Sequence, residues 1–205
     1  MTAYLNFHDV PKHTYRVILA DPDWQFKTYS AKGQGKSPGR HYLTPVSPVE
    51  HIMEQPVRDM IHPDGAVLFL WATWPTIFQA RDVIEAWGFK YSGLAWEWNK
   101  VNPETGKRAF GGGYITRKNL EPCLVATTKN FQTLASLKNR STRDLLVAGK
   151  RENSRKPDEQ YGMIEGLFDG PYLELYARQE RYGWDSAGNE VHKFGRSGFP
   201  IDIPG

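Results

Sequence analysis

The sequence predicts an α/β fold in which helices cover both faces of a single, doubly wound sheet. Val17–Ala20 and residues 66–73 are continuous apolar runs, the pattern of strands that are buried on both faces. Apolar side chains then recur at helical spacing between 77 and 87, so strands and helices alternate along the chain. A chain of 205 residues suits one sizeable domain. We therefore expect one domain over residues 1–205, with a Gly- and Pro-rich tail from 192 to 205.

Composition narrows the class of protein. Hydrophobic residues make up 40% of the chain, and its formal net charge of +3 is too small to diagnose a nucleic-acid-binding protein. Cys123 is the single cysteine and the six histidines are scattered, so we expect neither a disulfide nor a metal site. The N-terminus has no basic segment followed by an apolar one, and no apolar run approaches the ~20 residues of a membrane helix. A soluble, cytoplasmic protein without membrane contact is expected.

Caps, breakers and periodicity predict the remaining elements. Ser47 is a suitable N-cap for a helix over residues 48–61, which Pro56 is expected to shorten or kink. Gly88 ends the helix over residues 77–87. Three glycines at 111–113 permit close backbone approach, and a flexible hinge explains them equally well. The other expected elements are strand 89–99, an excursion at 101–108, strand 122–127, helix 158–168 and strand 172–178.

The tetrapeptide Asp21-Pro22-Asp23-Trp24 directly follows the first strand. Ligands bind at the carboxyl edge of an open α/β sheet, because the strand ends deliver side chains there and the loops above vary freely. A carboxylate, a proline carbonyl and a large aromatic ring within four residues suit a flat ring that bears an amino group. The alternative is an Asp-Pro turn that ends the strand, with Trp24 in the core.

Two segments concentrate positive charge. The predicted loop over residues 25–45 lies above the strand end and has no acid among its four basic residues, Lys27, Lys32, Lys36 and Arg40. Such a loop indicates a lid or a phosphate-contacting segment, although an ordinary solvated loop has the same composition. Residues 138–156 hold seven basic residues against two acidic ones, which fits either a solvated face or a surface along a phosphate backbone.

Glu174 is a lone glutamate inside the apolar strand predicted at 172–178. At the end of a parallel strand, a carboxylate can accept hydrogen bonds from the hydroxyls of a ribose, as it does in dinucleotide sites. A salt bridge to a neighbouring arginine or lysine explains the residue equally well. Both interpretations stay open from the strand alone.

Two distant segments together resemble one protein family. The first is Val17-Ile18-Leu19-Ala20-Asp21-Pro22-Asp23-Trp24. The second runs from Ser154-Arg155-Lys156-Pro157-Asp158-Glu159 through Tyr172-Leu173-Glu174-Leu175-Tyr176-Ala177-Arg178 to Gly183-Trp184 and Gly188-Asn189-Glu190. Both are similar to the adenine-N6 methyltransferases that use S-adenosylmethionine (SAM) and are named for the MT-A subunit of the mRNA enzyme, a family with many bacterial and phage members. With Arg40-His41-Tyr42, Leu70-Trp71 and residues 121–126, the resemblance covers about residues 15–191.

The resemblance implies a fold and a reaction. The fold is a Rossmann-like methyltransferase sheet with one antiparallel strand, circularly permuted so that the catalytic motif precedes the cofactor strand. Asp21 and the Pro22 carbonyl are then expected to accept hydrogen bonds from the exocyclic amine of adenine, with Trp24 stacked on the base. A target inside a duplex would have to be flipped out.

The resemblance also implies binding residues. For SAM these are Lys156 at the carboxylate, Glu174 and Arg178 near the ribose, and Asn189 with Glu190 at the ribose and adenine. Contacts to nucleic acid are expected from Lys27, Lys36, Arg40, His41 and Tyr42.

The chain departs from the family pattern at Asp23, where proline is usual, and after Arg178, where a His-Asn pair is common. Nothing resembles the zinc fingers of the eukaryotic writers, and a compact chain is more similar to bacterial and phage members, which modify DNA. The resemblance thus predicts a SAM-dependent DNA adenine-N6 methyltransferase. Two alternatives stay open, an RNA adenine-N6 methyltransferase and a non-catalytic nucleic-acid-binding partner. The sequence neither indicates nor excludes an oligomer.

Overall fold

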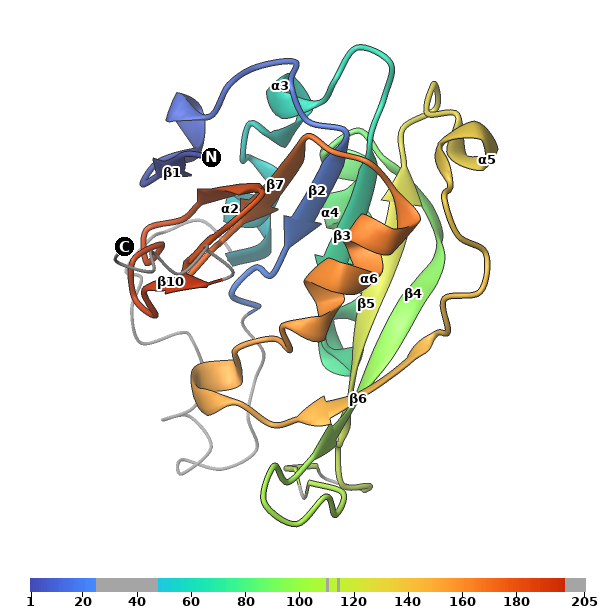
Figure 1. Ribbon diagram of the computed structural model, residues 1–205, viewed down its shortest axis with the longest axis vertical. Coiled ribbons are helices and arrows are strands. Elements are labelled where there is room, and N and C mark those ends of the chain that lie inside the picture. Colours follow the sequence, from blue (N-terminus) through green and yellow to red (C-terminus); the bar gives the residue numbers. More distant parts are fainter. Residues whose placement is uncertain (25–47, 110, 114, 198–205) are drawn as a thin grey trace, which may run out of the picture.

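The computed structural model describes residues 1–24, 48–109, 111–113 and 115–197 (Figure 1). Within these residues one sheet contains β1 (Ala3–Tyr4), β2 (Val17–Ala20), β3 (Val67–Trp71), β4 (Lys90–Val101), β5 (Leu120–Thr127), β6 (Leu145–Gly149), β7 (Tyr172–Leu175) and β9 (Trp184–Ala187). Their order is β1-β9-β7-β2-β3-β5-β4-β6. β5 is antiparallel to β3 and β4, whereas the other pairings are parallel. The predicted α/β sheet with one antiparallel strand is therefore confirmed.

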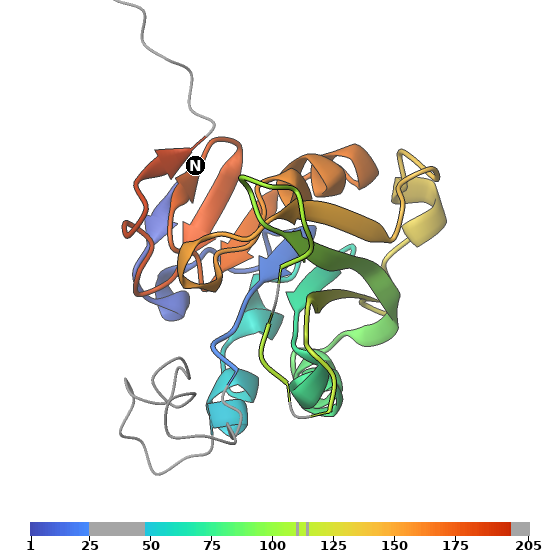
Figure 2. The ribbon, with the colours of Figure 1, turned by 90° about the horizontal axis from the view of Figure 1, so that it is seen from below.

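Helices cover both faces of the sheet. They are α2 (Pro48–Met53), α3 (Val57–Met60), α4 (Ile77–Ala86), α5 (Thr133–Ser136) and α6 (Glu159–Leu167), with short 3₁₀ turns η1 (Phe7–Asp9), η3 (Trp74–Thr76) and η4 (Glu152–Ser154). Figure 1 shows α6 on one face and α2 with α4 on the other. The perpendicular view in Figure 2 shows the same two helical layers. A small parallel pair, β8 (Glu180–Arg181) with β10 (Arg196–Ser197), lies outside the main sheet.

The central strands build a core on each face, because successive side chains of a strand point to opposite sides. Ile18 of β2 belongs to the cluster that contains Val83 of α4, whereas its neighbour Leu19 belongs to the cluster that contains Ile164 of α6. All four of these side chains are buried. Since both faces of β2 and β3 are covered, continuous apolar runs form these strands and alternating runs would not.

Two predicted elements end earlier than expected. The helix expected over 48–61 is interrupted at Pro56, so that α2 and α3 are separate short helices. Proline cannot donate the backbone hydrogen bond that a continuous helix needs there. Ser47 lies outside the described residues. The strand expected over 172–178 ends at Leu175, since Tyr176 has a left-handed backbone with φ of 59°.

Other turns agree with their prediction. Gly88 follows α4 with φ of 87°, a conformation that glycine adopts at low cost. At Gly111 a Cβ atom would lie 1.8 Å from the carbonyl oxygen of Lys118, so this glycine serves close backbone approach. In the tail, residues 192–197 include β10, and 198–205 lie outside the described residues. No helix in the described ranges has the length and apolar character needed to cross a membrane.

Candidate active site

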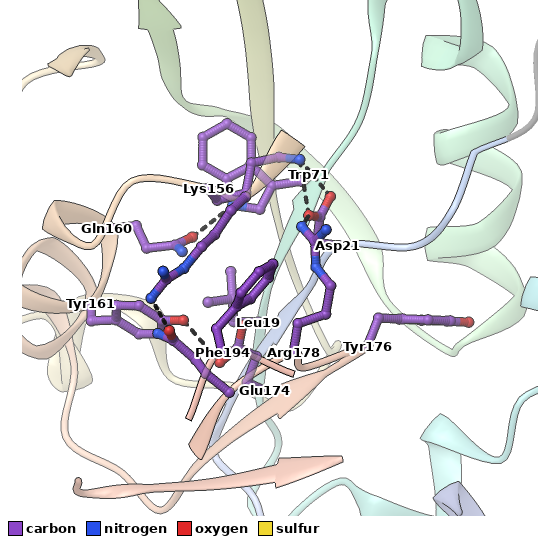
Figure 3. Close-up of a pocket in the computed structure, with 12 residues that line it drawn as sticks. Leu19, Asp21, Trp71, Lys156, Gln160, Tyr161, Glu174, Tyr176, Arg178 and Phe194 are labelled. Carbon is purple, nitrogen blue, oxygen red and sulfur yellow. Dashed lines mark hydrogen bonds and ion pairs between the residues drawn. The ribbon is translucent and has the colours of Figure 1, made fainter. Parts of the chain in front are cut away.

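The carboxyl ends of three neighbouring parallel strands meet at one pocket. Ala20 at the end of β2 is in register with Leu70 of β3 and Leu175 of β7, so the residues that follow these strands converge. The pocket opens to solvent (Figure 3), and the empty space within it, open solvent included, is about 380 Å³. Its lining residues are Leu19, Asp21, Trp71, Arg155, Lys156, Gln160, Tyr161, Glu174, Tyr176, Arg178, Gln179 and Phe194.

Asp21 and Lys156 form a bidentate ion pair in this pocket. Nζ of Lys156 lies 2.7 Å from Oδ1 and 2.9 Å from Oδ2 of Asp21. The ammonium also lies 5.5 Å from the centre of the Trp71 ring. Burial alone would lower the pKa of Lys156, but the charges of Asp21 and Glu121 outweigh it and raise that pKa above its usual value. Lys156 is therefore a stable cation inside the pocket.

A second carboxylate stands behind Lys156. Oε2 of Glu121, on β5, lies 3.6 Å from Nζ of Lys156, and Oε1 accepts a hydrogen bond from Lys100 of β4. Burial would raise the pKa of Glu121, but the two ammonium groups outweigh it and lower the pKa. The four charges Lys100, Glu121, Lys156 and Asp21 therefore alternate in sign from β4 to β2.

Glu174 faces the pocket on the side of α6. Its backbone pairs with Leu19, whose side chain lies on the same face, and Oε2 accepts a hydrogen bond of 2.9 Å from the Tyr161 hydroxyl. Burial raises the pKa of Glu174 to about 7, despite that hydrogen bond and two nearby arginines. The predicted placement of Glu174 and Asp21 at one sheet edge agrees with this geometry.

Two arginines and one aromatic ring complete the pocket. Nη2 of Arg178 lies 3.7 Å from Oδ2 of Asp21, and its guanidinium lies 5.7 Å from the centre of the Phe194 ring. The guanidinium of Arg155 lies 4.9 Å from the same centre and donates a hydrogen bond to Gln179. Phe194 was not predicted as a site residue, because it lies in the segment expected to form the tail and its one signal is an aromatic ring in a polar stretch.

Of the remaining tetrapeptide residues, Pro22 and Trp24 are buried and Asp23 is exposed. Trp24 is 4% exposed and donates a hydrogen bond of 2.8 Å from its indole to the carbonyl of Trp71, which is the arrangement of the core alternative. The Pro22 carbonyl accepts a hydrogen bond of 2.9 Å from the Trp24 backbone. Asp23 keeps solvent contact, yet the protein around its carboxylate and the like charge of Asp21 raise its pKa.

Other expected site residues lie apart from the pocket or outside the described part of the chain. Asn189 and Glu190 follow β9, are exposed and do not line the pocket, and Glu190 pairs with Lys193 at 2.8 Å. The expected nucleic-acid contacts Lys27, Lys36, Arg40, His41 and Tyr42 lie outside the described residues. In the described ranges, no three His, Cys, Asp or Glu side chains are grouped as metal ligands.

The chemistry of the pocket lining suits a small polar cofactor such as SAM. A buried carboxylate, Glu174, suits ribose hydroxyls as donors, and Lys156 and Arg178 suit a carboxylate as partner. Aromatic rings of Tyr161 and Phe194 border the same space.

Comparison with known proteins identifies the family. The MT-A70 family model matches residues 15–190. The type II methyltransferase M.MunI of Mycoplasma sp is 28% identical over 204 residues, which cover 90% of this chain and 81% of M.MunI.

Eukaryotic relatives match over a smaller share of their own length. An N(6)-adenosine-methyltransferase MT-A70-like protein of Arabidopsis thaliana is 29% identical, and the human N(6)-adenosine-methyltransferase catalytic subunit METTL3 is 27% identical. The matches cover 87% and 86% of this chain, which spans 24% and 28% of those relatives. Because the family model matches from just before β2 to just after β9, this chain belongs to the MT-A70 family, as its two sequence segments predicted.

Proposed function

We propose that the protein transfers a methyl group from SAM to the exocyclic N6 of adenine in DNA. Membership of the MT-A70 family and the likeness to M.MunI support an adenine methyltransferase. The observation that carries the proposal is that Asp21, at the end of β2, opens on the same pocket as the buried Glu174. Under this proposal, Asp21 holds the nucleobase amine beside the cofactor that Glu174 holds.

Asp21 and Pro22 prepare the amine for reaction. The lone pair of an adenine amine is conjugated with the ring, which makes it a poor nucleophile. If the Asp21 carboxylate and the Pro22 carbonyl accept its two hydrogens, the nitrogen becomes more pyramidal and its lone pair is free to attack. When bound, SAM supplies an electrophilic methyl group on a sulfonium. The new N–C bond forms as the C–S bond breaks, the electron pair stays on sulfur, and the nitrogen then loses a proton.

The cofactor contacts divide between two ends of the pocket. Glu174 accepts hydrogen bonds from the ribose, with Arg178 beside it, while Lys156 provides positive charge for the SAM carboxylate. Lys156 contacts both oxygens of Asp21, so its ammonium and the target amine compete for this carboxylate. The proposal assigns Trp24 a packing contact beneath the base site, because its ring is buried. Asn189 and Glu190 are proposed at the outer edge of the cofactor site.

We propose DNA over RNA because the chain is similar to the type II methyltransferase M.MunI, at 28% identity over 90% of this chain. We propose that the protein acts in the cytoplasm and that its substrate is a nucleic acid. An RNA substrate is the second candidate, because the N(6)-adenosine-methyltransferases match 86% or more of the chain.

A direct assay tests the proposal. The purified protein is incubated with methyl-labelled SAM and single-stranded DNA, duplex DNA or RNA of the same sequence, and the nucleosides are separated by mass spectrometry. We expect labelled N6-methyladenine in DNA. Label in RNA alone would replace DNA by RNA as substrate. Binding of DNA without methyl transfer, at any SAM concentration, would instead indicate a non-catalytic partner.

A further inference from the structure

An acceptor that makes no hydrogen bond lies next to the Lys156 ammonium. Oε2 of Glu121 is buried and has no hydrogen-bond partner, although Nζ of Lys156 lies only 3.6 Å away. The other oxygen, Oε1, is held by Lys100. Lys100 in turn lies 4.9 Å from the centre of the buried Trp98 ring. The Glu121 carboxylate is therefore fixed in place and directed toward Lys156.

Lys156 needs this acceptor when the target amine binds to Asp21. The Lys156 side chain is 10% exposed, so its ammonium has little access to water. A buried charge that loses its partner is strongly destabilised. When the target amine takes one oxygen of Asp21, Lys156 loses one of its two short hydrogen bonds to that residue. The Glu121 carboxylate, closing from 3.6 Å to hydrogen-bond distance, replaces it and leaves the other N–H groups of Lys156 for Asp21 and the SAM carboxylate.

We propose that Glu121 is a positioning residue for methyl transfer: it receives the Lys156 ammonium when Asp21 binds the target amine. The inference rests on the proposed role of Asp21. Glu121 itself touches no substrate and acts through Lys156. Lys100 contributes by keeping Glu121 oriented, with Oε2 toward Lys156. The two short hydrogen bonds between Lys156 and Asp21 are thus a resting arrangement, and Glu121 accepts the N–H that one of them releases.

One experiment follows the ammonium without any activity assay. NMR of ¹⁵N-lysine protein detects a buried lysine ammonium by its slow proton exchange. In D21N the Asp21 charge is removed, and we expect the Lys156 signal to persist at neutral pH because Glu121 takes over. In the double variant D21N/E121Q the signal should disappear. Loss of the signal in D21N alone would overturn the proposal, whether or not the protein methylates any substrate.

A kinetic experiment tests the consequence for transfer. At saturating SAM, E121Q should lower the single-turnover methylation rate at least tenfold and change the SAM dissociation constant less than threefold. Thermal unfolding checks that the variant is folded. The matched control is D169N, which removes the exposed Lys138–Asp169 pair of 2.7 Å and should leave the rate unchanged. An E121Q rate equal to that of the wild type would contradict the proposal, and equal losses in rate and SAM affinity would make Glu121 a cofactor-binding residue instead.

Discussion

Lys156 holds both carboxylate oxygens of Asp21, at 2.7 and 2.9 Å, although 135 residues separate the two in the sequence. The pair ties the end of β2 to the segment that leads into α6, and so fixes two sides of the pocket. It also occupies the oxygens that we assign to the target amine. Stability and reactivity therefore depend on the same contact.

Replacing Lys156 by methionine should destabilise the protein. The variant leaves the Asp21 and Glu121 carboxylates without their shared cation, and breaking a buried ion pair on one side typically costs ~3–5 kcal/mol. Arg178 and Lys100 still face these carboxylates, so we expect about 3 kcal/mol, the lower end of that range. Urea unfolding followed by fluorescence measures the free energy of unfolding.

The comparison for that prediction is Lys138→Met, which breaks an exposed pair with Asp169. Exposed pairs contribute ~0–1 kcal/mol, so this control should unfold almost like the wild type. Equal effects of the two substitutions would mean that the Lys156 pair is no more important for stability than a surface contact.

Glu174 should make stability depend on pH. Its pKa is about 7 in the folded protein and near 4.5 in the unfolded chain, so the folded state binds the proton more tightly. The contribution of Glu174 to stability is fully present below pH 4.5 and is lost as pH rises through 7. A shift of this size corresponds to at most about 3 kcal/mol.

The test compares the wild type with Glu174→Gln at pH 5 and pH 8, because other groups titrate in the same interval and cancel in the difference. We expect the variant to gain stability relative to the wild type on going to pH 8. A pH-independent difference in the free energy of unfolding would show that Glu174 stays ionised in the folded protein.

The basic residues before α2 should bind phosphate, as the sequence indicates. Replacing Lys36 and Arg40 by glutamine should weaken binding of every DNA sequence to the same extent and flatten the dependence of log K on log salt by ~0.9 for each phosphate that the variant no longer neutralises. Fluorescence anisotropy at several salt concentrations measures both quantities. A weakening confined to one DNA sequence would assign these residues to base recognition.

Long periodic or continuous apolar segments made most of the fold predictable. β2, β3, α4 and α6 lie where the sequence placed them, because burial on one or both faces dictates their apolar pattern. β6 and β9 were not predicted. Leu145 and Val147 of β6 are exposed, and β9 has the sequence Trp-Asp-Ser-Ala, so neither strand shows a clear apolar alternation.

The site was predictable where a single residue stands out from its surroundings. Asp21 is a carboxylate at the end of one apolar strand, and Glu174 is a carboxylate inside another. Both line the pocket. The pairing of Lys156 with Asp21 was not predictable, since it depends on how a distant loop packs. Glu121 carried the same signal as Glu174, a lone acid beside an apolar strand, but its partners Lys100 and Lys156 come from other elements.

The most direct test of the role of Asp21 is the rate of methyl transfer by the variant Asp21→Asn. The rate is measured in single turnover, with saturating labelled SAM and the best DNA substrate of the wild-type enzyme. The variant keeps the shape of the side chain but loses its charge and one of its two acceptors. We expect transfer to fall at least a hundredfold, while calorimetry shows a SAM affinity within about tenfold of the wild type, or ~1.4 kcal/mol. Transfer at the wild-type rate would contradict the assignment of Asp21 to the target amine, and a parallel loss of SAM binding would move Asp21 to the cofactor site.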